Sequence, residues 1–475
     1  MISRFPLLFL AIGLSSCAPL PPLVTNPVDE EKPAEAPPQA KTSEVPALPV
    51  AAPTENPSES ATKDSTDETK PFAPISPTPS LRADSSTSGP AFRERASYPA
   101  KVLPNDLQRD FRVGILVGVS KVEISGNSFT LGTRFADFPS GKTLAGLQKL
   151  SAKKGHVQSA IGLSDSVWIV PVESSRISVG NKEYRGKILV VNSSGKLNVI
   201  NVLPVEEYLK GVVPHEIGKL DSSMFEALKV QAVAARTYAY RHYNSRISQG
   251  FDVYATVQDQ VYNGSSGESP LTNAAIDSTK GLVLTYNGNL VEAYYHSTCG
   301  GYTEGVETWG LAPVPYLQSQ NDMKSADSAW CTGPHSSWKK VYSEKELVAM
   351  FKRNFKEARA EGKSNFGGIQ QIEIKSTFPG GRIAELEVLT DKGIFTVKGD
   401  RTRWLFKDGS KILFSSKFKI EKNGKVWVLD GSGFGHGIGM CQMGTRERAK
   451  AGQTFDAILK AYYPGTTLEC IQSAE

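Results

Sequence analysis

The chain has 475 residues, of which 22% are charged and 39% are hydrophobic, and its formal net charge is +5. This composition excludes collagen, a coiled coil and a wholly disordered protein, because it supplies enough apolar residues for a buried core. The longest apolar run, Phe5 to Leu14, is shorter than the roughly 20 residues that a helix needs to cross a bilayer. A polytopic membrane protein is therefore excluded as well.

The first residues predict export and a lipid anchor. Arg4 gives a positive start, the apolar run follows, and residues 14–17 (LSSC) resemble a bacterial lipobox. We therefore expect residues 1–16 to be a signal peptide and Cys17 to carry acyl chains that anchor the protein in a membrane. Ala18, in place of the Asp that resembles an inner-membrane retention signal, favours the periplasmic side of the outer membrane. The alternative is an ordinary signal peptide with a chance cysteine.

A long tether is predicted after the anchor, over residues 17–105. Sixteen of the 29 prolines lie in residues 21–100, and residues 21–69 carry a net charge of −7. Such a segment offers too little apolar surface to offset chain entropy, so we expect a Pro-rich disordered linker. Residues 70–475 then carry +11, because Arg4 supplies the only charge before residue 21. This basic body suits retention on an anionic envelope, and we predict no nucleic-acid partner.

A small, mostly β unit is predicted over residues 106–200. The run Phe111 to Val119 has the composition of a strand. One helix is predicted over residues 142–153. Further strands are predicted at residues 166–172, 187–191 and 196–202.

Helices and strands are mixed in residues 201–470, which we expect to form one larger domain. Pro204 fits the first turn of a short helix, and Ser222 or Ser223 could cap a longer helix that ends near Tyr243. Strands are predicted at residues 282–286, 372–374, 385–389, 394–398 and 425–429, and helices at residues 442–451 and 454–463. Because the elements do not alternate strictly, the predicted fold class is α+β.

Four cysteines would remain if Cys17 is acylated, and they are Cys299, Cys331, Cys441 and Cys470. An even number in an exported protein favours disulfides. However, His296-x₂-Cys299 has the spacing of half a zinc site, and Cys331-x₃-His335 could supply the other half. The 31-residue gap between the halves weakens the structural-zinc hypothesis. Disulfides, zinc and free thiols all stay open.

Two further positions could carry chemistry. Glu216 lies among apolar neighbours, which could raise its pKa and keep it protonated near neutrality, as a general acid requires. A solvated loop carboxylate is the alternative. The Gly-dense residues 431–439 could let the backbone approach a ligand or a neighbouring chain closely, and His436 could donate to a ligand there. A structural turn is the alternative.

Several ordered blocks of the sequence resemble the sporulation stage II protein D family, which has the SpoIID/LytB domain. They are residues 202–216, 226–238, 259–262 (DQVY), 295–304 (YHSTCGGYTE), 435–444 (GHGIGMCQMG) and 462–465 (YYPG). Their order and rough spacing are preserved over about residues 185–468, whereas residues 106–184 match weakly.

The resemblance implies a peptidoglycan lytic transglycosylase, active in cell-wall remodelling during division or sporulation. Such enzymes cleave the bond between N-acetylmuramic acid and N-acetylglucosamine, in several cases on glycan strands stripped of peptides, and need no metal or other cofactor for it. The family's catalytic acid maps onto Glu216. A glycan groove also needs aromatic, amide and hydroxyl groups, although core packing, helix capping or solvent exposure would explain each candidate equally well. The candidates are Lys229, Arg236, Gln260, Tyr262, Tyr294, Glu304, Trp309, His436 and Gln442.

Two other functions compete with this one. Some family members resemble amidase enhancers, so the chain could bind glycan without cleaving it and stimulate a cell-wall amidase. It could also be a purely structural, wall-binding lipoprotein.

Overall fold

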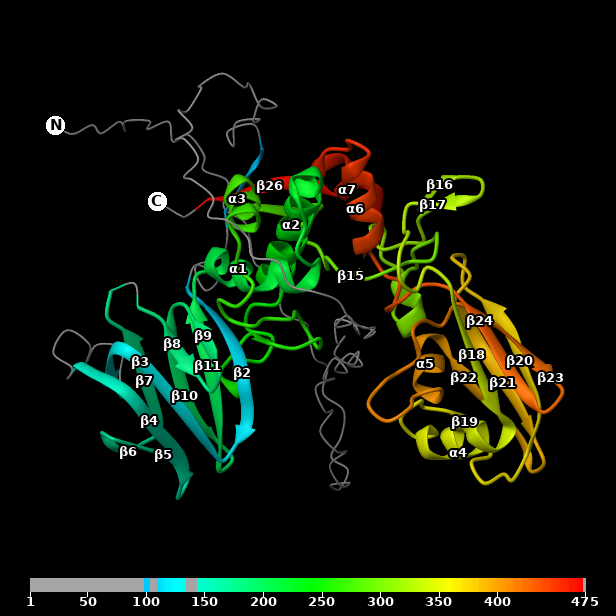
Figure 1. The fold of residues 1–475 in the computed structure, drawn as a ribbon, viewed down its shortest axis with the longest axis horizontal. Coiled ribbons are helices and arrows are strands. Elements are labelled where there is room, and N and C mark those ends of the chain that lie inside the picture. Colours follow the sequence, from blue (N-terminus) through cyan, green and yellow to red (C-terminus); the bar gives the residue numbers. More distant parts are fainter. Residues whose placement is uncertain (1–97, 103–108, 134–142, 174, 473–475) are drawn as a thin grey trace, which may run out of the picture. The chain divides into compact units, whose positions relative to one another are not determined.

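The computed structural model describes residues 98–102, 109–133, 143–173 and 175–472 (Figure 1). The predicted signal peptide, Cys17 and most of the predicted linker lie outside these residues. The predicted end of the linker at residue 105 is wrong, because Ala100–Val102 forms strand β1 and pairs in parallel with β26 (Thr467–Gln472). Among the described residues, no helix is long and apolar enough to span a membrane. The fold class is α+β, as predicted.

The N-terminal part of the described chain is a sheet of 11 strands. Its strands are β2 (Phe111–Val119), β3 (Lys121–Gly132), β4 (Thr143–Lys153), β5 (His156–Ser159), β6 (Gly162–Ser164), β7 (Ser166–Pro171), β8 (Ile177–Val179), β9 (Lys182–Tyr184), β10 (Lys187–Ser193), β11 (Lys196–Leu203) and β12 (Val253–Tyr254). The main path through the sheet is β12-β2-β11-β10-β7-β3-β4-β5-β6, and β8 and β9 branch from β3.

The helix predicted over residues 142–153 is wrong, since Thr143–Lys153 form strand β4. It pairs antiparallel with β3, from Lys121 opposite Ser151 to Thr130 opposite Thr143. Leu150 is buried in the core, and Gly146 has a φ of +77°, which an α-helix does not tolerate. Cross-strand pairing therefore overrides the helical appearance of the local sequence.

The sheet and the helices that follow it share one hydrophobic core, so no core boundary separates residues 200 and 201. Leu203 at the end of β11 belongs to the same buried cluster as Tyr208 and Leu228. The helices are α1 (Val205–Glu216), α2 (Phe225–Arg241), α3 (Pro270–Ser278), α6 (Gln442–Lys450) and α7 (Phe455–Tyr462). Helix α2 contacts the other four (Figure 1).

Two helix starts differ from the sequence prediction. Asp221, not a serine, caps the 3₁₀ turn Ser222–Met224 before α2, and its side chain accepts from Ser223 N at 2.9 Å. Helix α3 was not predicted, although Ser269 caps it by accepting from Thr272 N and Pro270 opens it.

Short strands join distant parts of the chain around these helices. Strands β13 (Leu282–Tyr286) and β14 (Asn289–Leu290) complete the sheet of β1 and β26. Strand β15 (Tyr295–His296) pairs in parallel with β25 (Met440–Cys441), and β16 (Met323–Ser325) pairs with β17 (Ser328–Ala329). The β15–β25 pair therefore brings two of the family-like sequence blocks together.

Residues 338–431 have a second hydrophobic core inside the predicted 201–470 domain. Trp338, Phe351 and Phe395 lie in this separate buried cluster. Its elements are β18 (Trp338–Ser343), α4 (Glu344–Asn354), β19 (Glu361–Gly362), β20 (Ile369–Thr377), β21 (Ile383–Thr390), β22 (Gly393–Lys398), α5 (Thr402–Leu405), β23 (Phe418–Asn423) and β24 (Val426–Gly431).

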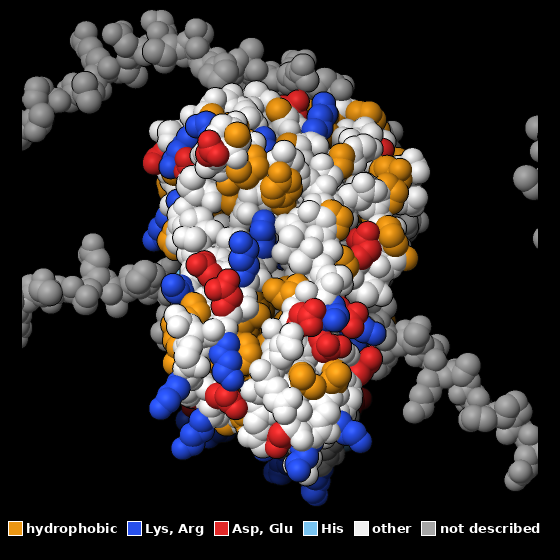
Figure 2. Space-filling model, turned by 90° about the vertical axis from the view of Figure 1, so that its right-hand side faces the viewer, with side chains coloured by type: hydrophobic (Ala, Val, Ile, Leu, Met, Phe, Trp, Pro, Cys, Tyr) orange, Lys and Arg blue, Asp and Glu red, His pale blue; other side chains and the backbone are white. Residues whose placement is uncertain are grey.

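On the face shown in Figure 2, acidic side chains lie between the basic ones, so the positive charge is not gathered into one patch there.

Candidate active site

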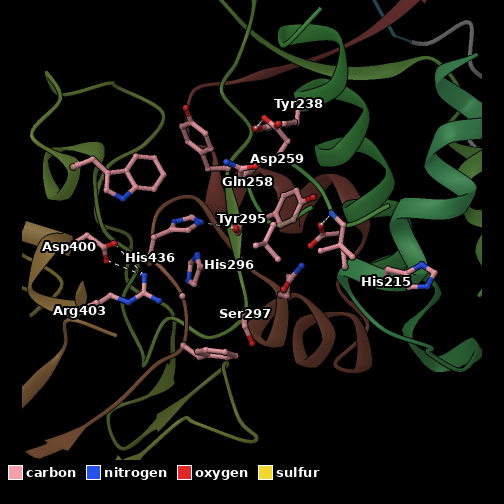
Figure 3. A pocket seen from close by; sticks show the side chains of 18 residues that line it. His215, Tyr238, Gln258, Asp259, Tyr295, His296, Ser297, Asp400, Arg403 and His436 are labelled. Carbon is pink, nitrogen blue, oxygen red and sulfur yellow. Dashed lines mark hydrogen bonds and ion pairs between the residues drawn. The ribbon is translucent and has the colours of Figure 1, made fainter. Parts of the chain in front are cut away.

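A cleft of about 280 Å³ lies at the C-terminal end of α1. Its walls come from α1, α2, the loop after β12, strand β15 and the segments around residues 400 and 436 (Figure 3). Five of the predicted catalytic and substrate-binding residues line it, namely Glu216, Tyr294, Trp309, His436 and Gln442.

Glu216 is the last residue of α1, not part of a loop between two helices. Gly218, with a φ of +84°, follows the helix in the left-handed conformation that commonly ends helices. This geometry places the Glu216 carboxyl group at the cleft, where its Oε1 atom accepts a hydrogen bond from Val261 N at 2.6 Å.

Burial raises the pKa of Glu216 from its ordinary value of 4.5 to about 7. The hydrogen bond from Val261 N and those from the side chains of Gln442 and Tyr295 favour the ionised form and limit this increase. The C-terminal end of α1 also disfavours a negative charge. The group can therefore both hold and release a proton near neutrality, which an acid/base catalyst needs.

A buried polar chain holds Tyr295 in place beside Glu216. Gln260 Nε2 donates to Tyr295 Oη at 3.0 Å, and Tyr208 Oη donates to Gln260 Oε1 at 3.2 Å. Gln260 is fully buried, so it positions Tyr295 and does not face the cleft. The structure thus places Gln260 behind Tyr295 and outside the lining of the cleft that was predicted to include it.

Gln442, the second side-chain donor to Glu216, is fixed from behind by α2. Its Nε2 atom donates to Oε1 of the fully buried Gln231 at 3.3 Å. Because Gln442 is the first residue of α6, this contact ties α2 and α6 together next to the carboxyl group.

Aromatic rings form the wall on one side of the cleft. The Trp309 ring meets Tyr294 edge-on at 5.1 Å and lies 5.0 Å from the His436 ring. Trp309 Nε1 has no hydrogen-bond partner among the described residues. The wall therefore offers ring surface, whereas the Nε1 atom is buried behind it.

His436 lines the cleft but cannot donate to a ligand from either nitrogen, contrary to the prediction. Its Nδ1 atom accepts from Ile438 N at 3.1 Å, so Nε2 carries the hydrogen and donates to Tyr295 O at 2.9 Å. Burial, with Arg403 and Arg382 nearby, lowers the pKa of His436 to about 3 and keeps the ring neutral.

His296 lines the cleft but is almost completely buried. It is 4% exposed, and its Nδ1 atom donates to Ile438 O at 3.1 Å. Its Nε2 atom has no partner among the described residues. Figure 3 shows the His296 and His436 rings between Tyr295 and Arg403.

Arg403 and Asp400 come to the cleft from the segment with the second core. Arg403 Nη1 lies 3.3 Å from Asp400 Oδ1 (Figure 3). The Nε atom of Arg403 donates to Leu413 O at 2.9 Å. Arg403 Nη2 has no partner within the described part of the chain. No sequence motif pointed to these two residues.

The other cleft residues that the prediction missed come mostly from segments next to predicted ones. They are His215, Tyr238, Val257, Gln258, Asp259, Val261, Tyr295, His296, Ser297, Phe434 and Gly435. His296 was predicted only as a metal ligand. Several of them could have been found from the sequence, because they directly neighbour the predicted residues Glu216, Tyr294 and His436.

Four further predicted substrate contacts lie outside the cleft and have structural partners. Lys229 pairs with Glu226, and Arg236 is fully buried against Glu206, with Nη2 and Oε2 2.8 Å apart. Tyr262 Oη donates to Asn201 Oδ1 at 2.6 Å inside the core. Glu304 is buried and accepts from Gly380 N at 2.7 Å.

The Gly-dense segment serves close backbone packing. A Cβ atom at Gly439 would lie 2.2 Å from Tyr294 O, and one at Gly437 would lie 2.1 Å from Arg382 Nε. Both glycines also have a positive φ. The groups that pack closely against these two glycines are therefore residues of the same chain and not a ligand.

Only two of the four predicted metal ligands lie together. Cys299 and Cys331 meet Cys441 and Asp322 in a buried cluster whose ligand atoms all lie within 4.8 Å of one another. The His296 ring is held at the cleft, and the His335 ring packs against Phe414 at 4.3 Å. Side-chain direction, which residue spacing does not reveal, thus excludes both histidines from the cluster.

Comparison with known families gives one match within each of the two hydrophobic cores. A family described as Stage II sporulation protein matches residues 193–286, and one described as Domain of unknown function (DUF8618) matches residues 334–439. The second match coincides closely with the segment that has its own hydrophobic core.

Several curated proteins are similar to this chain. It is 33% identical over 358 residues to an amidase enhancer of Bacillus subtilis, which covers 67% of this chain and 49% of that protein. It is 32% identical over 287 residues to an uncharacterized protein of Brachyspira hyodysenteriae, covering 60% of this chain and 72% of that protein. It is 35% identical over 282 residues to the stage II sporulation protein D of Bacillus subtilis, covering 56% and 74%. The chain thus spans about half the length of the amidase enhancer.

Proposed function

Because this chain belongs to the stage II sporulation protein D family, we propose that it acts on the bacterial cell wall as a peptidoglycan lytic transglycosylase. The observation that carries this proposal is Glu216, a carboxyl group with a pKa of about 7 that opens on a cleft with an aromatic wall. The bond cleaved would be the one between N-acetylmuramic acid and N-acetylglucosamine.

The reaction needs one acid that later acts as a base. Protonated Glu216 gives its proton to the bridging oxygen as the bond from that oxygen to muramyl C1 breaks, with an oxocarbenium-like transition state. The muramyl 6-hydroxyl oxygen then bonds to C1, and ionised Glu216 takes the hydroxyl proton. The product is a 1,6-anhydro sugar, no water is consumed, and Glu216 returns to its protonated form.

The other two carboxyl groups at the cleft are less suited to this role. Asp259 Oδ2 lies 3.1 Å from Arg246 Nη1, and its Oδ1 atom accepts from Tyr238 Oη at 2.9 Å. Asp400 is paired with Arg403. Since a two-carboxylate hydrolase needs a second free carboxylate, this arrangement favours a single acid/base mechanism.

The cleft offers suitable groups for a saccharide. Trp309 and Tyr294 present ring surface, and Gln258, Ser297 and Arg403 add polar side chains to the lining. We propose that peptidoglycan glycan strands, including strands without stem peptides, bind along these groups. Reaching the wall would depend on export, acylation of Cys17 and the linker that follows it, with the outer membrane as the site of anchoring.

A second candidate function is a non-catalytic enhancer of a cell-wall amidase. The 33% identity to the amidase enhancer favours it. In that case the chain would bind glycan and an amidase partner, and the carboxyl group of Glu216 would be dispensable.

One experiment separates the two functions. Purified full chain is incubated with intact and with peptide-free glycan strands, and the products are analysed by mass spectrometry. Glu216→Gln tests the acid, and Glu421→Gln, at an exposed position of β23, is the matched control. The transglycosylase proposal expects anhydro-muramyl ends from the wild type and the control, and a rate roughly 100- to 10,000-fold lower for Glu216→Gln.

The same variants are then added to a cell-wall amidase in the presence of peptidoglycan. If the wild type forms no anhydro-muramyl ends and Glu216→Gln stimulates the amidase as well as the wild type does, the enhancer function replaces the enzyme.

A further inference from the structure

The buried cluster of Cys299, Asp322, Cys331 and Cys441 has the composition and geometry of a metal site. Its four ligand atoms lie within 4.8 Å of one another, and all four residues are buried. Cys299 Sγ lies 3.2 Å from both Cys331 Sγ and Asp322 Oδ2. Zinc bonds of about 2.3 Å to sulfur and about 2.0 Å to oxygen would fit four such atoms around one ion after small adjustments.

Backbone amides point at the sulfur atoms. Gly301 N donates to Cys331 Sγ at 3.1 Å and to Cys299 Sγ at 3.3 Å. Gly444 N and Cys299 N donate to Cys441 Sγ at 3.4 and 3.3 Å. Donors of this kind stabilise thiolates, which are the form of cysteine that binds metal.

Asp322 is oriented so that one oxygen stays free for the cluster. Its Oδ1 atom accepts from Arg448 Nη2 at 3.0 Å and from Tyr462 Oη at 2.9 Å. Its Oδ2 atom faces Cys299 Sγ. Outer hydrogen bonds that fix one carboxylate oxygen and present the other are typical of metal ligands.

Basic groups around the cluster match the charge that a filled site would have. Three thiolates, one carboxylate and one Zn²⁺ would leave a net charge of −2. Arg448 contacts Asp322, and Lys417 Nζ donates at 2.9 Å to the carbonyl of Gly300, the residue after Cys299. A buried anionic site needs such partners.

A disulfide would involve only two of the four side chains in the cluster. The described cysteines are all free thiols. A Cys299–Cys331 bond would leave the third thiol, Cys441, and the oriented oxygen of Asp322 facing a neutral bridge. From the convergence of all four groups, we propose that Cys299, Cys331, Cys441 and Asp322 bind one structural zinc ion.

The zinc site would also position the two side-chain donors to Glu216. Cys441 directly precedes Gln442 in the sequence. Cys299 lies four residues after Tyr295, and Tyr295 pairs with Met440 in the β15–β25 ladder. The ion would thus fasten together the two paired segments that carry these donors. This second role rests on the proposed function, whereas zinc binding does not and would stand if the enzyme proposal failed.

The test measures metal directly. The full chain is exported with its own leader, without a polyhistidine tag, and is purified without chelator or reductant. Zinc per chain is measured by inductively coupled plasma mass spectrometry, and non-reduced peptides are mapped for disulfides. Cys441→Ser and Asp322→Asn remove one ligand each, and Cys470→Ser removes the described cysteine that lies outside the cluster.

The proposal expects about one zinc per chain in the wild type and in Cys470→Ser. It expects at least a tenfold loss of zinc in Cys441→Ser and a clear loss in Asp322→Asn. A metal-free wild type would overturn it, whether a Cys299–Cys331 cross-link or four free thiols are found. Full zinc content in soluble Cys441→Ser would refute this ligand set. The wild-type measurement decides the question even if the ligand variants do not fold.

Discussion

Replacing Glu216 with glutamine should stabilise the folded protein at alkaline pH and much less at acid pH. In the folded chain the pKa of this carboxyl group is about 7, whereas in the unfolded chain it returns to about 4.5. Between these values the folded state binds more protons than the unfolded state, so the free energy of unfolding falls as the pH rises. Glutamine carries no charge at any pH and can still accept from Val261 N.

The expected magnitude follows from the two pKa values. A rise from 4.5 to about 7 corresponds to about 3 kcal/mol, at roughly 1.4 kcal/mol for each tenfold change in the acid constant. Because the residue keeps part of its surface on the cleft, solvent screening reduces this figure. We therefore expect Glu216→Gln to gain about 1–3 kcal/mol over the wild type between pH 5 and pH 8.

Urea unfolding of both proteins at pH 5, 6, 7 and 8 measures this difference, with Glu421→Gln as the exposed control. The Glu216→Gln advantage should grow with pH, and the control should show no such trend. A stability difference that stays constant from pH 5 to pH 8, or that shrinks, would refute the conclusion that burial keeps Glu216 protonated.

Three other predictions concern groups around Glu216 and in the core. Tyr295→Phe removes a hydrogen bond that favours ionised Glu216, so the alkaline limb of the profile of kcat/KM against pH should move to higher pH; an unmoved limb would contradict the contact. Arg236→Met leaves Glu206 without its buried partner and should lower the free energy of unfolding in urea by about 3 kcal/mol. A variant that keeps its stability but loses glycan binding would instead indicate that Arg236 contacts the substrate. Trp309→Ala should raise KM for glycan about fivefold with kcat nearly unchanged, from the loss of about 1 kcal/mol of ring contact, and an unaltered KM would remove Trp309 from the binding surface.

The apolar pattern of the sequence predicted those strands and helices whose structure depends mainly on their own residues. Strands Phe111–Val119 and Leu282–Tyr286 have the predicted bounds, because a short run of apolar and β-branched residues favours a strand. The helix after Pro204 was predicted too short, and its extension to Glu216 depends on tertiary packing of its apolar face and on Gly218 as its end. Tertiary packing likewise overrode the helical pattern of residues 142–153.

The predicted residues that line the cleft lie mostly in the family-like sequence blocks, and Tyr294 and Trp309 lie close to one of them. Those blocks contain Glu216, His436 and Gln442, all of which line the cleft. Asp322 joins the cysteines through long-range folding, and no spacing rule relates it to them. Arg403 reaches the cleft from the segment with the second core, which the sequence analysis did not separate from the rest of the domain.

The most direct test of the central claim is cleavage of glycan strands in H₂¹⁸O. If Glu216 passes its proton to the leaving oxygen and the muramyl 6-hydroxyl attacks C1, the new muramyl ends contain no ¹⁸O and are one water lighter than a hydrolysed end. Muramyl ends that carry one ¹⁸O atom would show that water is the nucleophile and would contradict the transglycosylase mechanism.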